Sequence, residues 1–226
     1  MNGHTAIAID GPVASGKSAV GSRVAQALGY RFIDTGVMYR AITWLALERD
    51  IDLHDEAALT KLATDAQLTI EPGPPDAPEA SRVQIDGIDV TDRLRSPAVG
   101  EAVSLVSRAS GVRQAMVALQ RKLAAGGGTV MAGRDIGTVV LPGAQLKVYL
   151  DASVEERVRR RHEELLVAGK AATLEEVRQE LALRDTIDSG RDVSPLRPAE
   201  DAIIIHTDHL SLDDVVEQIL VLAQCR

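Results

Sequence analysis

The chain has 226 residues and a formal net charge of −8, from 33 acidic and 25 basic residues. Its hydrophobic content of 45% is enough to bury a core, which excludes a disordered chain and suits one large or two small domains. The acidic balance argues against a surface that coats nucleic acid or an anionic membrane. Only five of the basic residues are lysines. This excess of arginine reflects either composition alone or a site for phosphates and carboxylates, which guanidinium groups bind in a bidentate manner.

Cysteine and histidine usage narrows the class further. Cys225 is the only cysteine, so an intrachain disulfide and a cysteine-based zinc site are both excluded. The five histidines lack the spacing of metal ligands. No apolar run of about 18 residues occurs, and the N-terminus does not have the pattern of a signal peptide. We therefore expect a cytoplasmic protein that binds neither membrane nor nucleic acid.

Short apolar runs alternate with helical patterns at both ends of the chain. At the start, apolar runs at residues 5–10 and 31–33 predict buried strands, with helices predicted over residues 17–28 and 37–49. Further strands are predicted at residues 129–132, 146–150 and 203–205. Helix starts are expected at Ser153, Thr173 and Ser211, because an acid follows each hydroxyl three residues later. This order is typical of parallel α/β units.

The middle of the chain has a different pattern. Three short strands are predicted here, at residues 67–71, 82–85 and 88–90, and Asp86-Gly87 is a strong hairpin signal. The segment from Pro72 to Pro78 holds four of the nine prolines, and we assign it no function. We expect a small antiparallel insertion at about residues 67–91, followed by helices that begin near Ser96-Pro97 and near Gly111.

A phosphate-binding motif lies between the first predicted strand and the first predicted helix. Residues 11–18 match G-x-x-x-x-G-K-[ST], whose backbone N–H groups and helix N-terminus bind phosphate oxygens. Lys17 is predicted to bridge the β- and γ-phosphates, and the Ser18 hydroxyl to ligate Mg²⁺. The alternative is an ordinary glycine turn. The predicted contacts with the nucleotide come from Gly11, Pro12, Val13, Ala14, Ser15, Gly16, Lys17, Ser18 and Ala19.

Other features limit the kind of phosphate-loop protein. No Asn-Lys-x-Asp segment of a GTPase is present, and residues 129–132 lead to Gly133-Arg134-Asp135 instead of the acid that ends a motor ATPase strand. Arginines follow two strand ends, at Arg40 and Arg134. Because ligands of open α/β sheets bind outside the carboxyl ends of the strands, both should lie near the phosphate loop. We infer a second substrate that carries a phosphate.

Four segments together resemble the bacterial cytidylate kinase family over nearly the whole chain. They are residues 9–18, Asp34-Thr-Gly-Val-Met-Tyr-Arg40, Gly133-Arg-Asp-Ile-Gly-Thr-Val-Val140 with its following proline, and Arg184-Asp-x-x-Asp188-x-x-Arg191. The phosphate loop alone is shared with adenylate, shikimate and dephospho-coenzyme A kinases. The resemblance implies transfer of the γ-phosphoryl group of ATP, with Mg²⁺, to CMP or dCMP.

The family's architecture would divide the chain into three parts. The resemblance implies a P-loop NTPase core with a parallel sheet flanked by helices, a small antiparallel insertion that binds the nucleoside monophosphate, and a short helical lid. The core would comprise residues 1–50, 111–155 and 193–226, the insertion residues 51–110, and the lid residues 156–192. CMP and dCMP would be its partners, and we expect a monomer.

The resemblance also implies roles for individual residues. Arg40 and Arg134 would hold the acceptor phosphate, and Arg184 would reach phosphates from the lid. The cytosine pocket would consist of Thr35, Arg113, Asp135 and Arg191, and the sugar would face Ser104 and Asp188. Arg113 could instead pair with a neighbouring acid, and Ser104 could be a helix surface residue. Asp34 or Asp135 could order Mg²⁺ through water.

Four arginines at positions 157, 159, 160 and 161 have two interpretations. Arg157, Arg160 and Arg161 share one helix face beside the expected lid, which suits stabilisation of transferred charge and favours Arg157 and Arg161 as catalytic groups beside Lys17, Arg134 and Arg184. Salt bridges to nearby glutamates explain the run equally well. Ile187 occupies a position where the family would have a basic residue.

Two other functions stay open from the sequence. One is a kinase for a different small acceptor, such as AMP, UMP or a shikimate-like hydroxyl compound. The other is a nucleotide-dependent regulator that binds ATP with little turnover, although the chain shows neither a switch signature nor an evident apolar patch.

Overall fold

A five-stranded parallel sheet forms the centre of the molecule in the computed structural model, which describes residues 5–71 and 81–225. The strands are β1 Ala6–Asp10, β2 Arg31–Asp34, β6 Thr129–Gly133, β7 Leu146–Asp151 and β8 Ile203–His206, in the order β2-β6-β1-β7-β8. All neighbouring pairs are parallel. The predicted parallel α/β fold is therefore confirmed. Among the described residues, no helix has both the length and the apolar character needed to cross a bilayer.

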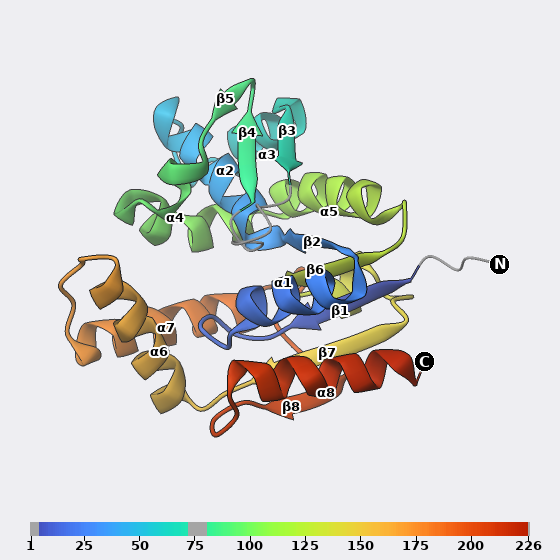
Figure 1. Ribbon diagram of the computed structural model, residues 1–226. Helices are drawn as coiled ribbons and strands as arrows, with labels where there is room; N and C mark the ends of the chain where they lie inside the picture. The colour runs from blue at the N-terminus through green and yellow to red at the C-terminus, as the bar shows by residue number, and fades with distance from the viewer. Residues whose placement is uncertain (1–4, 72–80, 226) are drawn as a thin grey trace.

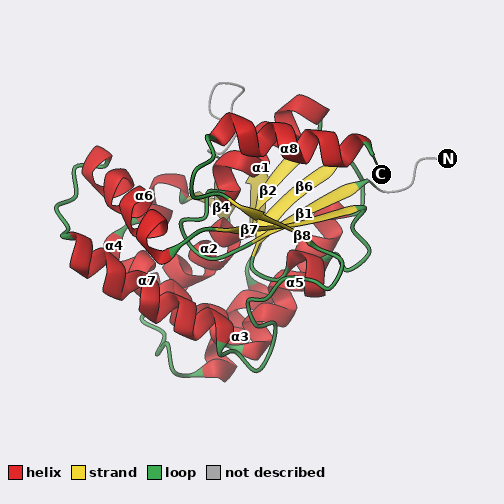
Figure 2. Ribbon diagram, turned by 90° about the horizontal axis from the view of Figure 1, so that it is seen from below, coloured by secondary structure: helices red, strands yellow, loops and turns green. Residues whose placement is uncertain are grey.

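Helices cover both faces of this sheet (Figure 2). Ile7 and Ile9 of β1 pack with α1 (Lys17–Leu28) and α8 (Leu212–Gln224), whereas Ala8 packs with α5 (Ser110–Ala124) and the π-helical turn η2 (Ile136–Val140). Burial on both faces explains why the strands appear in the sequence as continuous apolar runs. Because the strands are parallel, the carboxyl ends of β1, β2 and β6 meet at one edge of the sheet.

The middle of the chain forms a separate antiparallel sheet, as predicted. The sheet consists of β3 Leu68–Glu71, β4 Arg82–Ile85 and β5 Ile88–Asp89. The helices before it are α2 Thr35–Glu48 and α3 Glu56–Asp65, and those after it are the short helix η1 Thr91–Arg95 and α4 Pro97–Arg108. The turn between β4 and β5 has positive φ at both Asp86 (49°) and Gly87 (79°), as a two-residue hairpin turn requires. The predicted segment from Pro72 to Pro78 lies outside the described residues.

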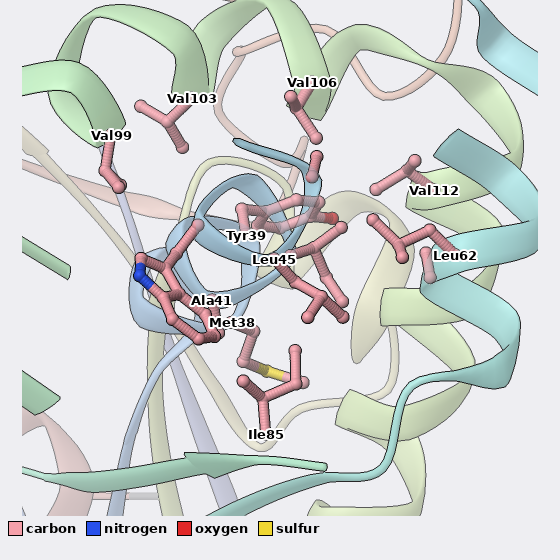
Figure 3. Close-up of a cluster of buried hydrophobic side chains, with 14 of the residues drawn as sticks. Met38, Tyr39, Ala41, Leu45, Leu62, Ile85, Val99, Val103, Val106 and Val112 are labelled. Carbon is pink, nitrogen blue, oxygen red and sulfur yellow. The ribbon is translucent and has the colours of Figure 1, made fainter. Parts of the chain in front are cut away.

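A second apolar core surrounds α2 (Figure 3). Met38, Tyr39 and Leu45 of α2 lie among buried residues from α3, α4, α5 and β4, including Leu62, Val99, Val103, Val106, Val112 and Ile85. Because α2 begins at the end of β2 and α5 leads into β6, the chain connects this separate core directly to the main sheet. The insertion is thus held against the edge where the strands end.

Two helices after β7, α6 (Val154–Val167) and α7 (Leu174–Ser189), form an α6–α7 pair beside α4 (Figure 1). Ser153, Thr173 and Ser211 cap α6, α7 and α8, which confirms the three predicted helix starts. The apolar contact of the pair joins Val158 and Val177 to Val13 of the loop after β1. The pair therefore rests directly on the predicted phosphate loop.

The start of α2 differs from the prediction. The helix begins at Thr35 instead of residue 37, because the Asp34 carboxylate accepts the Gly36 N–H at 2.8 Å and acts as the N-cap. Residues 34–36 precede the helix in the prediction, but in the structure Asp34-Thr35-Gly36 is where the helix starts. The helices α3, η1 and η2 were not predicted.

Gly111 offers a test of helix packing in the insertion. A Cβ added to Gly111 would lie 2.1–2.7 Å from Thr60 atoms, whereas one added to Gly100 would meet nothing within 4 Å. We expect Gly111→Ala to lower the free energy of unfolding by about 1–3 kcal/mol through overpacking. Gly100→Ala, its matched control, should raise it by up to about 1 kcal/mol because alanine favours the helix. Urea unfolding of both variants measures the difference, and equal effects would contradict the proposed contact between α3 and α5.

Candidate active site

The loop after β1 has the backbone of a phosphate-binding loop. Gly11 has a φ of 152°, and a Cβ there would lie 2.2 Å from the Leu150 carbonyl oxygen, so no other residue fits. Gly16 (φ 89°) and Ala14 (φ 60°) also have left-handed backbone, and Gly16 leads directly into α1. The loop therefore curves around a hollow, and the N-terminus of α1 points into that hollow, where a phosphate would bind.

Lys17 lies inside this loop. Its ammonium group donates to the Pro12 carbonyl oxygen at 2.5 Å and to Ser15 Oγ at 3.3 Å, and the residue is buried. Burial lowers the pKa of Lys17 well below its ordinary value, and the nearby positive charge of Arg134 lowers it further. A phosphate group in the loop would favour the charged form of this lysine.

Ser18 and Asp34 form the other polar pair at the loop. The Ser18 hydroxyl donates to Asp34 Oδ2 at 2.6 Å, while Asp34 Oδ1 accepts the Gly36 N–H. A serine hydroxyl and a carboxylate are oxygen ligands of the kind that Mg²⁺ prefers, alongside phosphate and water. Among the described residues, no group of three or more His, Cys, Asp and Glu side chains could hold a metal ion unaided. The pair therefore fits a metal that arrives with a nucleotide.

Asp188 joins two arginines beside the loop. Its carboxylate pairs with Arg134 Nε at 2.7 Å and with Arg191 Nη2, which also donates to Ser107 Oγ at 3.0 Å. Burial alone would raise the pKa of Asp188, but the charges of Arg134 and Arg191 overcome it and hold the pKa below its ordinary value. The carboxylate is thus ionised and fixes residues that follow β6 and α7.

Arg113 and Asp135 form a second, deeper ion pair. Arg113 Nη2 lies 2.6 Å from Asp135 Oδ2, with both side chains about 95% buried or more. Arg113 Nη1 also donates to the Ser107 carbonyl oxygen at 3.2 Å, and its guanidinium group lies 5.3 Å from the centroid of the Tyr39 ring. The alternative interpretation, in which Arg113 pairs with a neighbouring acid on a helix face, is wrong, because its partner is Asp135, itself a residue of the predicted site.

Arg40, Arg134 and Arg184 bring positive charges close together. Burial, followed by the charge of Arg184, lowers the pKa of Arg40 to about 10. The pKa of Arg184 is lowered in turn by burial and by Arg134, although Glu180 lies 3.2 Å from its Nη1. Arg40 Nη1 donates to the Leu94 carbonyl oxygen at 3.2 Å. Such crowding of like charges is unfavourable unless an anion binds among them.

Thr35 and Ser104 complete the predicted set. Thr35 Oγ1 donates to the Ala132 carbonyl oxygen at 2.9 Å, and a Cβ on Gly133 would lie 2.6 Å from that hydroxyl. Ser104 is buried on α4, three residues before Ser107. It is therefore not the helix surface residue that the alternative interpretation required.

The arginines of α6 divide into two groups. Arg157 is buried, donates twice to Asp185 at 3.1 and 2.6 Å, and contacts the Val13 carbonyl oxygen at 3.4 Å. Arg160 pairs with Glu156 of its own helix at 2.8 Å, but it also donates to Thr207 and lies 3.9 Å from where a Cβ of Gly16 would be. Arg159 and Arg161 pair with glutamates of their own helix, as the salt-bridge interpretation expected.

Several residues of the site were missed from the sequence. Ser107 links Arg113 and Arg191, Tyr39 lies against Arg113, and Asp185 holds Arg157. Asp10 is buried at the end of β1 and accepts two backbone N–H groups. For Asp10 a signal existed, since an acid closes an otherwise apolar strand directly before the glycine loop. Asp185 stands in the fourth segment that resembles the family, but it received no role, and Ser107 had no comparable signal.

A phosphate loop, a polar pair that fits Mg²⁺ and three crowded arginines at one edge of a parallel sheet define the class of phosphate-loop phosphotransferases. The family model described as cytidylate kinase matches residues 7–225. The chain belongs to the cytidylate kinase family.

Individual relatives agree with this assignment. The chain is 52% identical over 220 residues to a cytidylate kinase of Geobacillus kaustophilus, a match that covers 97% of this chain and 96% of the relative. It is 47% identical over 226 residues to a cytidylate kinase of Anoxybacillus flavithermus, covering 100% and 99%. A solved gluconokinase from Sinorhizobium meliloti shares the fold, with a TM-score of 0.52, 15% identity and coverage of 98% and 93%.

The Arg113–Asp135 pair should contribute strongly to stability. Asp135→Ala leaves the Arg113 charge buried without its carboxylate, so we expect a loss of about 3–5 kcal/mol in the free energy of unfolding. The exposed pair Lys61–Asp65 supplies the control, because Asp65→Ala should change stability by no more than about 0.5 kcal/mol. Urea unfolding compares the two, and similar losses would show that Arg113 does not depend on Asp135.

Proposed function

We propose that this chain transfers the γ-phosphoryl group of ATP to CMP or dCMP, giving ADP and CDP or dCDP. The observation that supports the proposal is that Arg40, Arg134 and Arg184 lie close together near the phosphate loop, which we interpret as a second anion site. Membership of the cytidylate kinase family supports the choice of acceptor.

ATP would bind at the loop formed by residues 11–19, where Lys17 contacts the β- and γ-phosphates. Mg²⁺ would be held by Ser18, with Asp34 acting through water. Asp34 suits this role better than Asp135, because it already bonds to Ser18 whereas Asp135 pairs with Arg113. The metal would supply charge neutralisation at the phosphates.

The acceptor would lie on the other side of Arg134. Arg40 and Arg134 would hold its phosphate, with Arg184 contributing from the α6–α7 pair. Ser104 and Asp188 would face the sugar. The base would lie among Thr35, Arg113, Asp135 and Arg191. Cytosine presents an exocyclic amine, which donates to a carboxylate, beside two acceptors, which accept from arginines. Uracil has the reverse pattern on this edge, so it would leave polar groups of the pocket without a hydrogen-bond partner.

The chemistry requires alignment and charge neutralisation more than proton transfer. The acceptor is a phosphate oxygen, so no general base with an unusual pKa is needed. Lys17, Arg134 and Arg184 would stabilise the transferred charge directly. Arg157 and Arg161 could join them, but each first has to leave its acid, Asp185 or Glu164.

We further propose that different segments of the chain have different functions. Residues 51–110 would bind the nucleoside monophosphate and residues 156–192 would act as a lid over a core made of residues 1–50, 111–155 and 193–226. Closure of these parts would exclude water from the transferred group. The proposed enzyme acts as a cytoplasmic monomer on small nucleotides.

An acceptor panel tests the proposed function. Release of ADP from ATP should be fast with CMP and dCMP, and at least about 100-fold slower with UMP, AMP or shikimate, because those acceptors leave buried polar groups unpaired. A coupled assay under saturating Mg²⁺ measures the rates. Activity on AMP but not on CMP would favour another small-molecule kinase, and ATP binding without turnover on any acceptor would favour a regulator.

Lys17 should be essential for turnover but not for acceptor binding. Lys17→Ala removes the charge next to the transferred phosphoryl group, so we expect kcat to fall by a factor on the order of 10² or more. Binding of CMP, measured by calorimetry, should persist. Lys122→Ala, at an exposed lysine of α5, is the control and should leave both unchanged. Normal turnover by Lys17→Ala would refute the assignment of the loop.

A further inference from the structure

Asp10 is a buried carboxylate at the junction of the two substrate sites. It is the last residue of β1 and stands directly before Gly11, where the phosphate loop begins. Only 3% of the residue is exposed. Ile7 and Ile9 face α1 and α8, so by alternation Asp10 faces the opposite side of the sheet, where Ile136 packs. None of the roles proposed above includes it.

Both oxygens of this carboxylate are bound by one backbone turn. Oδ1 accepts the Ile136 N–H and Oδ2 the Gly137 N–H, each at 2.7 Å. These are the first two N–H groups of η2, which have no partner within the turn itself. Bonds from N–H groups to a charged carboxylate are stronger than those to a neutral acceptor. The Asp10 carboxylate, which is not part of η2, thus fixes the first residues of that turn.

The held turn carries the residues proposed to bind the acceptor. In the sheet, Asp10 pairs in register with Gly133, the last residue of β6, so the ladder ends there. Arg134 and Asp135 follow Gly133 and precede Ile136, and therefore lie between the end of the sheet and the anchor on Asp10. Their backbone is fixed on one side by the β6 ladder and on the other by the Asp10 carboxylate.

The surroundings of Asp10 make its negative charge costly. Burial raises the pKa of Asp10 to about 6, against the opposing effect of the two N–H groups, with the Asp135 charge raising it and Lys17 lowering it. A Cβ on Gly137 would lie 3.2 Å from Lys147 Cδ and 3.3 Å from Asp10 Oδ2, so the anchor is tightly packed. A buried carboxylate costs free energy that an apolar residue would not.

We propose that Asp10 is a positioning residue for the acceptor, whose carboxylate fixes the start of η2 and thereby sets Arg134 and Asp135 in register with the phosphate loop. Because the same residue ends β1 and precedes Gly11, it ties the place where the donor phosphates bind to the place where the acceptor binds. This inference rests on the proposed function, since it assigns Arg134 and Asp135 to the acceptor.

Asp10→Asn tests the inference. The amide keeps one acceptor oxygen but turns an NH₂ group toward the second N–H, so half of the anchor is lost. We expect KM for CMP to rise at least about ten-fold, the loss that follows a broken bond to a charged group, while KM for ATP changes less than about two-fold. Preference for CMP over UMP should fall as well. Steady-state kinetics with each substrate varied in turn measures the split.

Thr129→Val is the matched control, because Thr129 is a fully buried polar residue at the opposite end of the same sheet. It should lower stability without a selective rise in KM for CMP. If Asp10→Asn is not soluble, Gly137→Ala replaces it, since its Cβ would crowd Asp10 Oδ2 at 3.3 Å and disturb the anchor. Unchanged kinetics, or equal rises in both KM values, would overturn the role of Asp10.

Assays of the wild-type protein show whether a negative result contradicts the role of Asp10 or the proposed function. Turnover of CMP by the wild type supports the proposed function whatever Asp10→Asn does. If the wild type uses another acceptor, the proposed function fails. The role of Asp10 is then tested by whether Asp10→Asn raises KM for that acceptor at least about ten-fold while KM for ATP changes less than about two-fold. If the wild type turns over no acceptor but binds CMP in calorimetry, weaker binding by Asp10→Asn supports the anchor and equal binding overturns it. A wild type that turns over no acceptor and does not bind CMP would overturn both.

Discussion

Buried ion pairs between three arginines and two carboxylates connect the parts of the site. Arg113 comes from α5, Arg134 from the end of β6 and Arg191 from the segment after α7, and they meet Asp135 and Asp188. Removal of such charges from water costs several kcal/mol per ion, which only close geometry and further hydrogen bonds can offset. The donor to acceptor distances of 2.6 and 2.7 Å, and the additional bonds to Ser107, meet that requirement. One guanidinium charge is left without a carboxylate.

Two further arginines lie nearby: Arg40 adds to this positive charge, whereas Arg184 pairs with Glu180. Arg40 and Arg184 have pKa values below the ordinary range, because burial and neighbouring positive charges disfavour their charged forms. A folded protein gains nothing from such crowding unless an anion offsets it. The excess of arginine in a chain of net charge −8 therefore has two explanations. Arginines such as Arg159 pair with acids on the surface, while those at the sheet edge are the ones proposed above to bind phosphate.

Local rules account for what could be predicted from the sequence. The helix over Lys17–Leu28 was correct at both ends, since a glycine-rich loop precedes it and Gly29 caps it with a φ of 67°. The approximate places of Arg134 and Asp135 followed from the rule that ligands bind beyond strand ends. The partners of Asp10 could not be predicted, because they are backbone N–H groups of a turn 126 residues away. Nothing in residues 136–140 distinguishes a π-helical turn from a strand.

Two contacts join the region of the α6–α7 pair to the part of the chain before α5. Arg191 reaches Ser107 of α4, and Lys170 donates to the Arg95 carbonyl oxygen at 3.0 Å. The Lys170 bond is exposed, so it contributes little free energy and its loss costs little. The Arg191 contact belongs to the buried network around Asp188, where a substrate phosphate or sugar would change the balance of charge. If residues 156–192 act as the proposed lid, a substrate at Asp188 would act on the buried contact, and the exposed Lys170 bond would oppose the movement only weakly.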